Sequence, residues 1–137
     1  MLSDRIGSRL ERVVELDDGE RVVAEGEPGA EMFIVLEGRI RISKATEGDG
    51  RVELAELGRG QFFGEMSVLE SAPRDADVHA VGHVRLLAIG QGSLLVRLRR
   101  DPSFALELLH QLSKRVRVLN ERVSELEGRG PEVGGDR

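Results

Sequence analysis

The amino-acid sequence predicts a mainly β fold, an antiparallel sandwich or small roll-shaped barrel, followed by one long C-terminal helix. Between residues 13 and 89, short apolar stretches are separated by glycine-rich turns about every 8–12 residues, a spacing typical of antiparallel sandwiches and barrels. From Asp101 onward, apolar residues recur at helical spacing instead. The length of 137 residues suits one self-sufficient domain, which we expect to span residues 1–127.

The predicted strands alternate with turn signals. The first five predicted strands are residues 13–16, 21–24, 31–36, 39–43 and 52–57. The Gly-Asp-Gly sequence at residues 48–50 predicts a hairpin between the last two. Glycines that we expect at tight corners or close backbone approaches are Gly19, Gly26, Gly29, Gly38, Gly50 and Gly60. Before the first strand, Ile6, Leu10 and Val13 recur at helical spacing and predict a short leading helix.

The C-terminal helix is expected at about residues 101–127. Asp101 suits the N-cap position and Pro102 the first helical position. The apolar residues that follow are spaced alternately by four and three: Ala105, Leu109, Leu112, Val116, Leu119, Val123 and Leu126. This heptad pattern predicts that the helix pairs with a second helix, so we expect a homodimer. Residues 128–137 are glycine-rich and lack periodicity, so we expect a disordered tail.

Composition argues against several classes of protein. The net charge of −5 disfavours nucleic-acid binding, which depends on neutralising phosphates. The chain has no cysteine, which excludes disulfides and thiolate metal sites and is compatible with a reducing cytosol. The longest unbroken apolar run is five residues, 32–36, far below the length of a membrane span. We therefore expect a soluble, cytoplasmic protein without a membrane segment.

The sequence offers little for catalysis. His79 and His83 are four residues apart on a predicted strand, roughly 13 Å, which is too far for them to share a metal ion. His110 stands alone, and the nucleophile, metalloprotease and phosphate-loop motifs are absent from the sequence. Glu65 and Glu70 lie five residues apart and form no evident acid–base pair. We expect neither an enzyme nor a bound metal.

The stretch from residue 62 to residue 78 carries the strongest functional signal. Gly64 and Glu65 stand where a short helix is expected to begin, and Pro73 and Arg74 follow. A helix N-terminus attracts phosphate, and an arginine can pair with phosphate oxygens through two N–H groups. A glutamate only accepts hydrogen bonds, so it suits a sugar hydroxyl. The pattern predicts a pocket for a small sugar phosphate.

A wider set of motifs gives the chain a family resemblance. It comprises Gly26-Glu27-Pro28-Gly29, residues 33–38, Gly60, Phe63-Gly64-Glu65, Pro73-Arg74 and Asp101-Pro102. With these motifs the chain resembles the cyclic-nucleotide-binding domain, most of all the sensory half of bacterial transcription regulators of the cyclic AMP receptor protein type. The resemblance implies a jelly-roll-like barrel of about eight strands. It also implies a phosphate-binding cassette, a dimerisation helix, and cyclic AMP or cyclic GMP as ligand.

The resemblance also implies roles for individual residues. Glu65 would bind the ribose 2′-hydroxyl and Arg74 the cyclic phosphate. The main-chain N–H groups expected to complete the phosphate site belong to Gly64, Glu65, Met66 and Ala76. The residues expected at the base are Ile42, Leu54 and Ala55 on strands, with Arg115, Leu119 and Asn120 on the helix. Asn120 could either read a purine edge or set the register of the helix pair.

One residue at the phosphate site departs from the family pattern. The residue after the arginine is usually Ser, Thr or Ala, whereas here it is Asp75, with Asp77 two residues on. A carboxylate about 4 Å from a phosphate oxygen would cost about 4 kcal/mol at an effective dielectric of about 20, roughly a thousandfold in affinity. If Asp75 turns outward, the penalty shrinks, and its main-chain N–H could still bind the phosphate. Alternatively, Asp75 or Asp77 pairs with Arg74 and closes the pocket.

Two hypotheses for function follow. The first is a ligand-sensing regulatory module that couples cassette occupancy to the C-terminal helix, with cyclic-nucleotide binding weakened or lost because of Asp75. The second is a degenerate fold that serves as a ligand-free dimerisation or interaction domain. Regulators of this type append a basic helix-turn-helix domain, and this chain shows none, so we expect no direct binding to nucleic acid.

Overall fold

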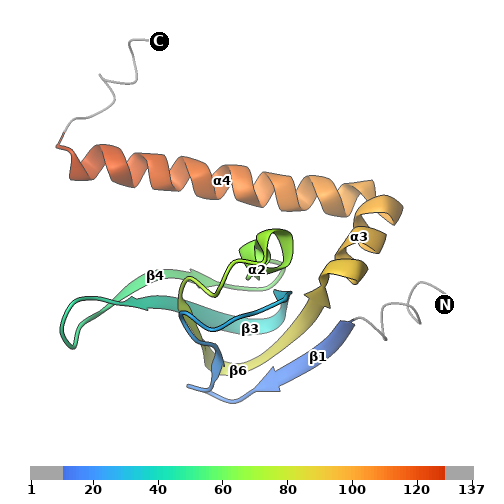
Figure 1. Ribbon diagram of the computed structural model, residues 1–137, viewed down its shortest axis with the longest axis horizontal. Helices are drawn as coiled ribbons and strands as arrows, with labels where there is room; N and C mark the ends of the chain where they lie inside the picture. The colour runs from blue at the N-terminus through green and yellow to red at the C-terminus, as the bar shows by residue number, and fades with distance from the viewer. Residues whose placement is uncertain (1–10, 129–137) are drawn as a thin grey trace, which may run out of the picture. The chain divides into compact units, whose positions relative to one another are not determined.

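The computed structural model describes residues 11–128, which contain six strands and three helices (Figure 1). In chain order these are β1 (Glu11–Leu16), β2 (Arg21–Val23), β3 (Glu31–Ala45), β4 (Arg51–Leu57), β5 (Phe62–Phe63), α2 (Glu65–Glu70), β6 (Asp77–Gly90), α3 (Gln91–Arg100) and α4 (Pro102–Leu126). The chain divides after Val96 into two compact units, each of which is described by itself.

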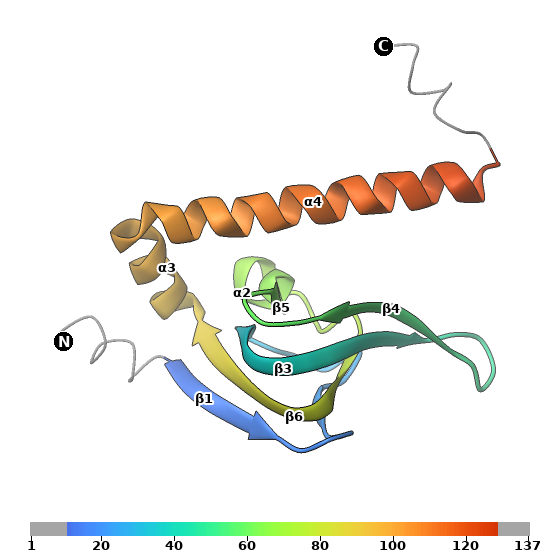
Figure 2. The same ribbon diagram turned by 180° about the vertical axis from the view of Figure 1, so that it is seen from behind.

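The first unit is built around the long strands β3 and β6. All strand pairs are antiparallel, in the order β1-β6-β3-β4, with β2 pairing with β6 and β5 with β3. Figure 2 shows β5 leading into α2 from the opposite side of the molecule. The predicted fold class, an antiparallel β-roll with C-terminal helices, is confirmed, although the sheet does not close into a barrel.

The number of strands is lower than the resemblance implied, because β3 continues through Gly38. We expected separate strands before and after this glycine, yet residues 31–45 form one strand with two register shifts around it. Gly38 has a φ of 86°, and a Cβ there would collide with the His83 main-chain oxygen on the neighbouring strand. Gly38 therefore marks an irregularity inside a strand and not a turn between two strands.

The core of this unit follows from alternation along the strands. On β6, the even-numbered residues Val78, Ala80, Val84, Leu86 and Ala88 are buried. Successive side chains of a strand point to opposite faces, so these residues share the inner face of the roll.

The predicted hairpin between β3 and β4 is confirmed. Ala45 pairs with Arg51, and the Thr46 N–H donates to the Gly50 carbonyl oxygen at 2.9 Å.

The predicted leading helix falls largely on residues 1–10, outside the described residues, and Val13 lies in strand β1. The predicted tail likewise falls outside the described residues from residue 129 on.

The second unit contains the helix α4, which matches the predicted helix within about one residue at each end. The Asp101 carboxylate accepts a hydrogen bond from the Phe104 N–H at 3.2 Å, and Pro102 occupies the first helical position. Along the heptad stripe, five residues are each more than half exposed: Leu109, Val116, Leu119, Val123 and Leu126. Among residues 11–128, no helix combines the length and apolar character that crossing a bilayer requires.

Candidate phosphate-binding site

Arg74 is the centre of the candidate site, and its side chain is only 8% exposed. Its Nη1 donates to the Glu31 carbonyl oxygen at 2.8 Å, and its guanidinium carbon lies 5.5 Å from the centre of the Phe33 ring. Its main chain is bound on both sides, because the Arg74 N–H donates to the Glu27 carbonyl oxygen and the Gly26 N–H donates to the Arg74 carbonyl oxygen. The side chain of Arg74 is therefore held by the start of β3, and its main chain by the segment that joins β2 to β3.

Two glycines lie so close to the Arg74 guanidinium that a side chain on either would overlap it. A Cβ on Gly29 would lie 2.6 Å from Arg74 Nη2 and nearer still to Nε. A Cβ on Gly64 would lie 2.8 Å from Arg74 Nη1 and 3.1 Å from the Glu31 carbonyl oxygen. The structure thus brings Gly64 and Arg74, two of the predicted site residues, together. It adds Glu31, whose main-chain oxygen leaves no signal in the sequence, and Gly29, which was expected at a tight corner or a close backbone approach but not beside Arg74.

The guanidinium keeps its charge without an ion-pair partner in the described part of the chain. Burial lowers the pKa of Arg74, while the negative charges of Glu31, Asp75 and Glu27 act in the opposite direction. An arginine remains protonated despite such a shift, because its ordinary pKa is above 12. Among residues 11–128, no nitrogen of Arg74 is both fully buried and without a hydrogen-bond partner. Such a group is suited to an anion that presents two oxygens.

The two aspartates of the cassette do not close the site. Asp75 is exposed to solvent. Asp77 pairs with Arg51, with 2.5 Å between Oδ2 and Nη2, and its Oδ1 accepts from the Glu25 N–H at 2.6 Å. In the described part of the chain neither carboxylate forms an ion pair with Arg74. Of the two alternatives for these aspartates, the structure agrees with an outward-facing Asp75 and not with an ion pair that closes the site over Arg74.

Helix α2 supplies the other predicted phosphate contacts. Gly64 is its N-cap, in the left-handed conformation with φ of 83°, and Glu65 is its first residue and half-buried. Met66 is exposed at the start of α2, whereas Ala76 is buried in the segment before β6. The Ser67 N–H bonds back to the Gly64 carbonyl oxygen at 3.2 Å. The main-chain N–H groups at the start of a helix are the ones suited to an anion.

The predicted base-contacting residues on strands lie together on β3 and β4. Ile42 pairs with Ala55, and the register shift that follows leaves Leu54 as the extra residue of a bulge. All three side chains are half-buried. A bulge re-aims side chains, which lets Leu54 and Ala55 both contribute an apolar surface although they are adjacent in sequence.

The predicted helix contacts belong to the second unit. Arg115 is half-buried on α4, and Leu119 and Asn120 are exposed. Arg115 and Leu119 are four residues apart, so they share one face of the helix. Their role in binding a ligand stays a prediction.

An antiparallel roll that presents a buried arginine beside a helix N-terminus is the architecture of a domain that binds a small anionic ligand. The family model of the Cyclic nucleotide-binding domain matches residues 13–101, and the chain belongs to this family.

Similar proteins support this assignment. The chain is 30% identical over 114 residues to the CRP-like cAMP-activated global transcriptional regulator of Mycobacterium tuberculosis, over 82% of this chain and 50% of the relative. It is 36% identical over 115 residues to a putative potassium channel protein of Rhodopseudomonas palustris, over 83% of this chain and 27% of the relative. The chain therefore spans half or less of these relatives.

A solved structure gives the same result for the fold. The crystal structure of the Thermus thermophilus catabolite activator protein matches with a TM-score of 0.78 at 28% identity, over 92% of this chain and 59% of that one.

Proposed function

We propose that this domain is a ligand-sensing regulatory module that binds a cyclic nucleotide, cyclic AMP or cyclic GMP, with the cyclic phosphate at Arg74 and the ribose 2′-hydroxyl at Glu65. The observation that carries the proposal is the buried guanidinium of Arg74, which no carboxylate among residues 11–128 neutralises by an ion pair. A buried charge is costly unless an opposite charge and hydrogen bonds compensate it. A cyclic phosphate would supply both.

The exposure of Asp75 supports weakened binding over lost binding. A carboxylate in water-like surroundings about 4 Å from a phosphate oxygen costs only about 1 kcal/mol, compared with about 4 kcal/mol in a partly buried setting. The smaller cost corresponds to roughly a fivefold loss of affinity. We therefore expect the family's ligand to bind, although less tightly than it would with a small neutral residue in place of Asp75.

The nature of the site also favours binding over catalysis. The groups proposed for the phosphate are a guanidinium and main-chain amides, which stabilise an anion but do not act as nucleophile or general base at neutral pH. Regulation would then require that the ligand bind two arrangements of the domain and helix α4 with different affinities. The exposed stripe of α4 would join two copies in a homodimer, as its heptad spacing predicts.

Calorimetric titration with cyclic AMP and cyclic GMP tests the proposal. We expect saturable binding to the wild-type chain and at least a tenfold loss in Arg74→Gln, since this variant removes a charge-assisted contact. Arg39→Gln is the matched control, because Arg39 is an exposed arginine paired with Glu56 on the sheet surface. Thermal melting gives a second readout, since ligand at 100 times its dissociation constant adds about 2.7 kcal/mol to the free energy of unfolding.

A second candidate function rests on α4 alone. Its exposed apolar stripe would serve an interaction domain equally well if no cyclic nucleotide binds. Sedimentation analysis with and without cyclic nucleotide separates the two functions. A dimer that neither binds the nucleotide nor changes with it would support the second function.

A further inference from the structure

Asp77, the first residue of β6, connects three segments that are distant in sequence. Its Oδ1 accepts from the Glu25 N–H at 2.6 Å, and its Oδ2 pairs with Arg51 at 2.5 Å. The Asp77 side chain is 13% exposed, so much of the carboxylate is shielded from water by these neighbours. The Glu25 N–H, burial and Arg51 all act on the pKa of Asp77, and their balance lowers it. The carboxylate is therefore charged and fixed at neutral pH.

The first arm of this network leads to Arg74. Glu25 begins the segment that passes over Arg74, and the next two residues exchange main-chain hydrogen bonds with it: Gly26 N–H to the Arg74 oxygen at 2.7 Å and Arg74 N–H to the Glu27 oxygen at 2.8 Å. Further along the same segment, Gly29 packs against the guanidinium. The hydrogen bond from the Glu25 N–H to Asp77 thus anchors the segment that positions Arg74.

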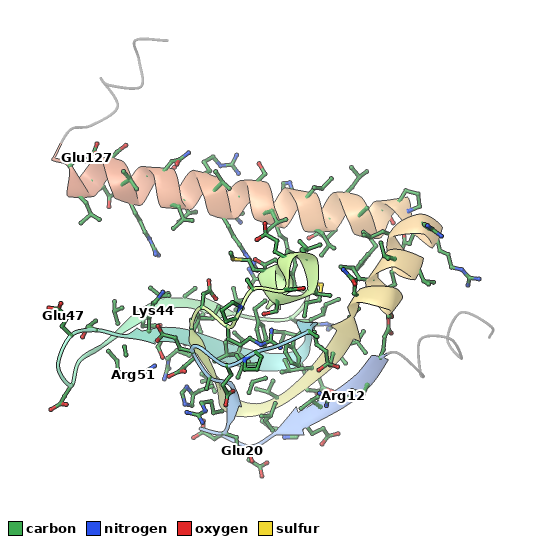
Figure 3. All side chains as sticks on the ribbon, viewed as in Figure 1. Arg12, Glu20, Lys44, Glu47, Arg51 and Glu127 are labelled. Atoms are coloured by element: carbon green, nitrogen blue, oxygen red, sulfur yellow. The ribbon has the colours of Figure 1, made fainter. Side chains whose placement is uncertain are left out.

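The second arm leads to the hairpin of β3 and β4. Arg51 donates to Asp77 and to the hydroxyl of Ser43, which is buried, at 3.0 Å. Figure 3 labels Arg51 on this hairpin together with Lys44 and Glu47. Ser43 follows Ile42, one of the residues predicted at the base. Arg51 also neutralises Asp77, so this carboxylate does not compete for Arg74.

We propose that Asp77 is a positioning residue for the anion site: it holds the segment of residues 25–29 against Arg74 and so sets the geometry of the guanidinium. The inference rests on the proposed function for its ligand, but the positioning of Arg74 can be tested without ligand. Asp77→Ala removes both arms of the network. Asp77→Asn keeps an oxygen that can accept from the Glu25 N–H and removes the charge.

Amide hydrogen exchange of the ligand-free full chain tests the positioning itself. We expect the amides of Glu25, Gly26 and Arg74 to exchange about tenfold faster in Asp77→Ala, and less than that in Asp77→Asn. The Val35 amide, which donates to the Gln61 carbonyl oxygen at 2.9 Å, serves as internal reference and should not change. Unchanged exchange at Gly26 and Arg74 in Asp77→Ala would overturn the inference, as would a uniform acceleration that includes Val35.

Titration with cyclic AMP tests the consequence for binding. We expect about tenfold weaker binding in Asp77→Ala, the effect of losing one charge-assisted contact, and partial recovery in Asp77→Asn. Glu56→Gln is the matched control, since Glu56 is a carboxylate paired with Arg39 and Arg41 on the same hairpin and should leave affinity unchanged.

The Arg74→Lys background shows whether Asp77 acts through Arg74. There, Asp77→Ala should weaken binding less than twofold, because the planar guanidinium that it positions is gone. An equal loss in both backgrounds would mean that Asp77 acts on stability in general, and would refute the positioning role. If the wild-type chain binds neither cyclic AMP nor cyclic GMP, the proposed function fails, while hydrogen exchange still decides the role of Asp77.

Discussion

Replacing Gly29 with alanine is the sharpest test of the anion site, because the substitution adds one methyl group at a known place. Gly29 does not have a left-handed φ, so alanine brings no backbone strain. Its Cβ would lie 2.6 Å from Arg74 Nη2, well inside ordinary van der Waals contact, and nearer still to Nε. The guanidinium would have to move by about 1 Å, since nonbonded carbon atoms normally stay about 3.5 Å apart or more.

Such a displacement would disturb the hydrogen bond from Arg74 to the Glu31 carbonyl oxygen, which is 2.8 Å long. A hydrogen bond to a charged group contributes about 1.5–3 kcal/mol, so losing one equivalent contact to the ligand weakens binding roughly 10- to 100-fold. We expect this loss for cyclic AMP in Gly29→Ala, with the fold retained because the side chain that moves is flexible.

Isothermal titration and thermal melting of three variants complete the test. Gly90→Ala and Gly58→Ala are controls, because a Cβ on Gly90 meets nothing within 4 Å and one on Gly58 meets only Arg39 Cγ at 3.8 Å. Both should bind like wild type. Binding by Gly29→Ala within twofold of wild type would refute the reasoning that Arg74 holds the ligand in the observed position.

Three further predictions concern the strand irregularity and the two aspartates. Gly38→Ala should destabilise the chain by more than about 2 kcal/mol in urea unfolding, because it combines a positive φ with a collision at the His83 oxygen; a loss below 1 kcal/mol would show that β3 relaxes there. Asp75→Asn should raise cyclic AMP affinity by less than about tenfold, whereas a gain near a thousandfold would mean that this carboxylate faces the phosphate. Asp77 has a lowered pKa, so its contribution to stability should be present above the unfolded value of about 3.9 and lost as the pH falls through its folded value. Unfolding of wild type and Asp77→Asn should therefore differ by about 1 kcal/mol at pH 7, and this difference should shrink as the pH falls below about 4; a difference that stays constant as the pH falls would contradict the assignment.

Features that depend on neighbouring residues could be predicted from the sequence. The cap of α4 involves Asp101 and Phe104, and the cassette places Gly64 and Arg74 within one short stretch. Turn chemistry, helix caps and heptad spacing act over a few residues, so their signals are visible in one sequence.

Contacts between distant segments could not be predicted in this way. The Arg74 guanidinium bonds to a carbonyl 43 residues away, and Asp77 pairs with an arginine 26 residues away. Every residue has a main-chain oxygen, so the sequence does not show which one will accept a hydrogen bond from Arg74. Likewise, an aspartate near Arg74 in sequence does not show that it will pair with a different arginine. The positive φ and the close backbone approach expected at Gly38 are present, but the strand break expected there was wrong for a related reason, since only the neighbouring strand decides between a bulge and a turn.

Gly29 and Gly64 enclose Arg74 with main-chain surface, which an exchange of side chains elsewhere cannot remodel. In an engineered variant, the position of the Arg74 guanidinium would therefore stay the same while side chains on the surrounding strands are replaced. In a biosensor built on this domain, we expect replacements of Ile42 or Leu54 to shift the ratio of cyclic AMP to cyclic GMP affinity while the hold on the phosphate stays constant.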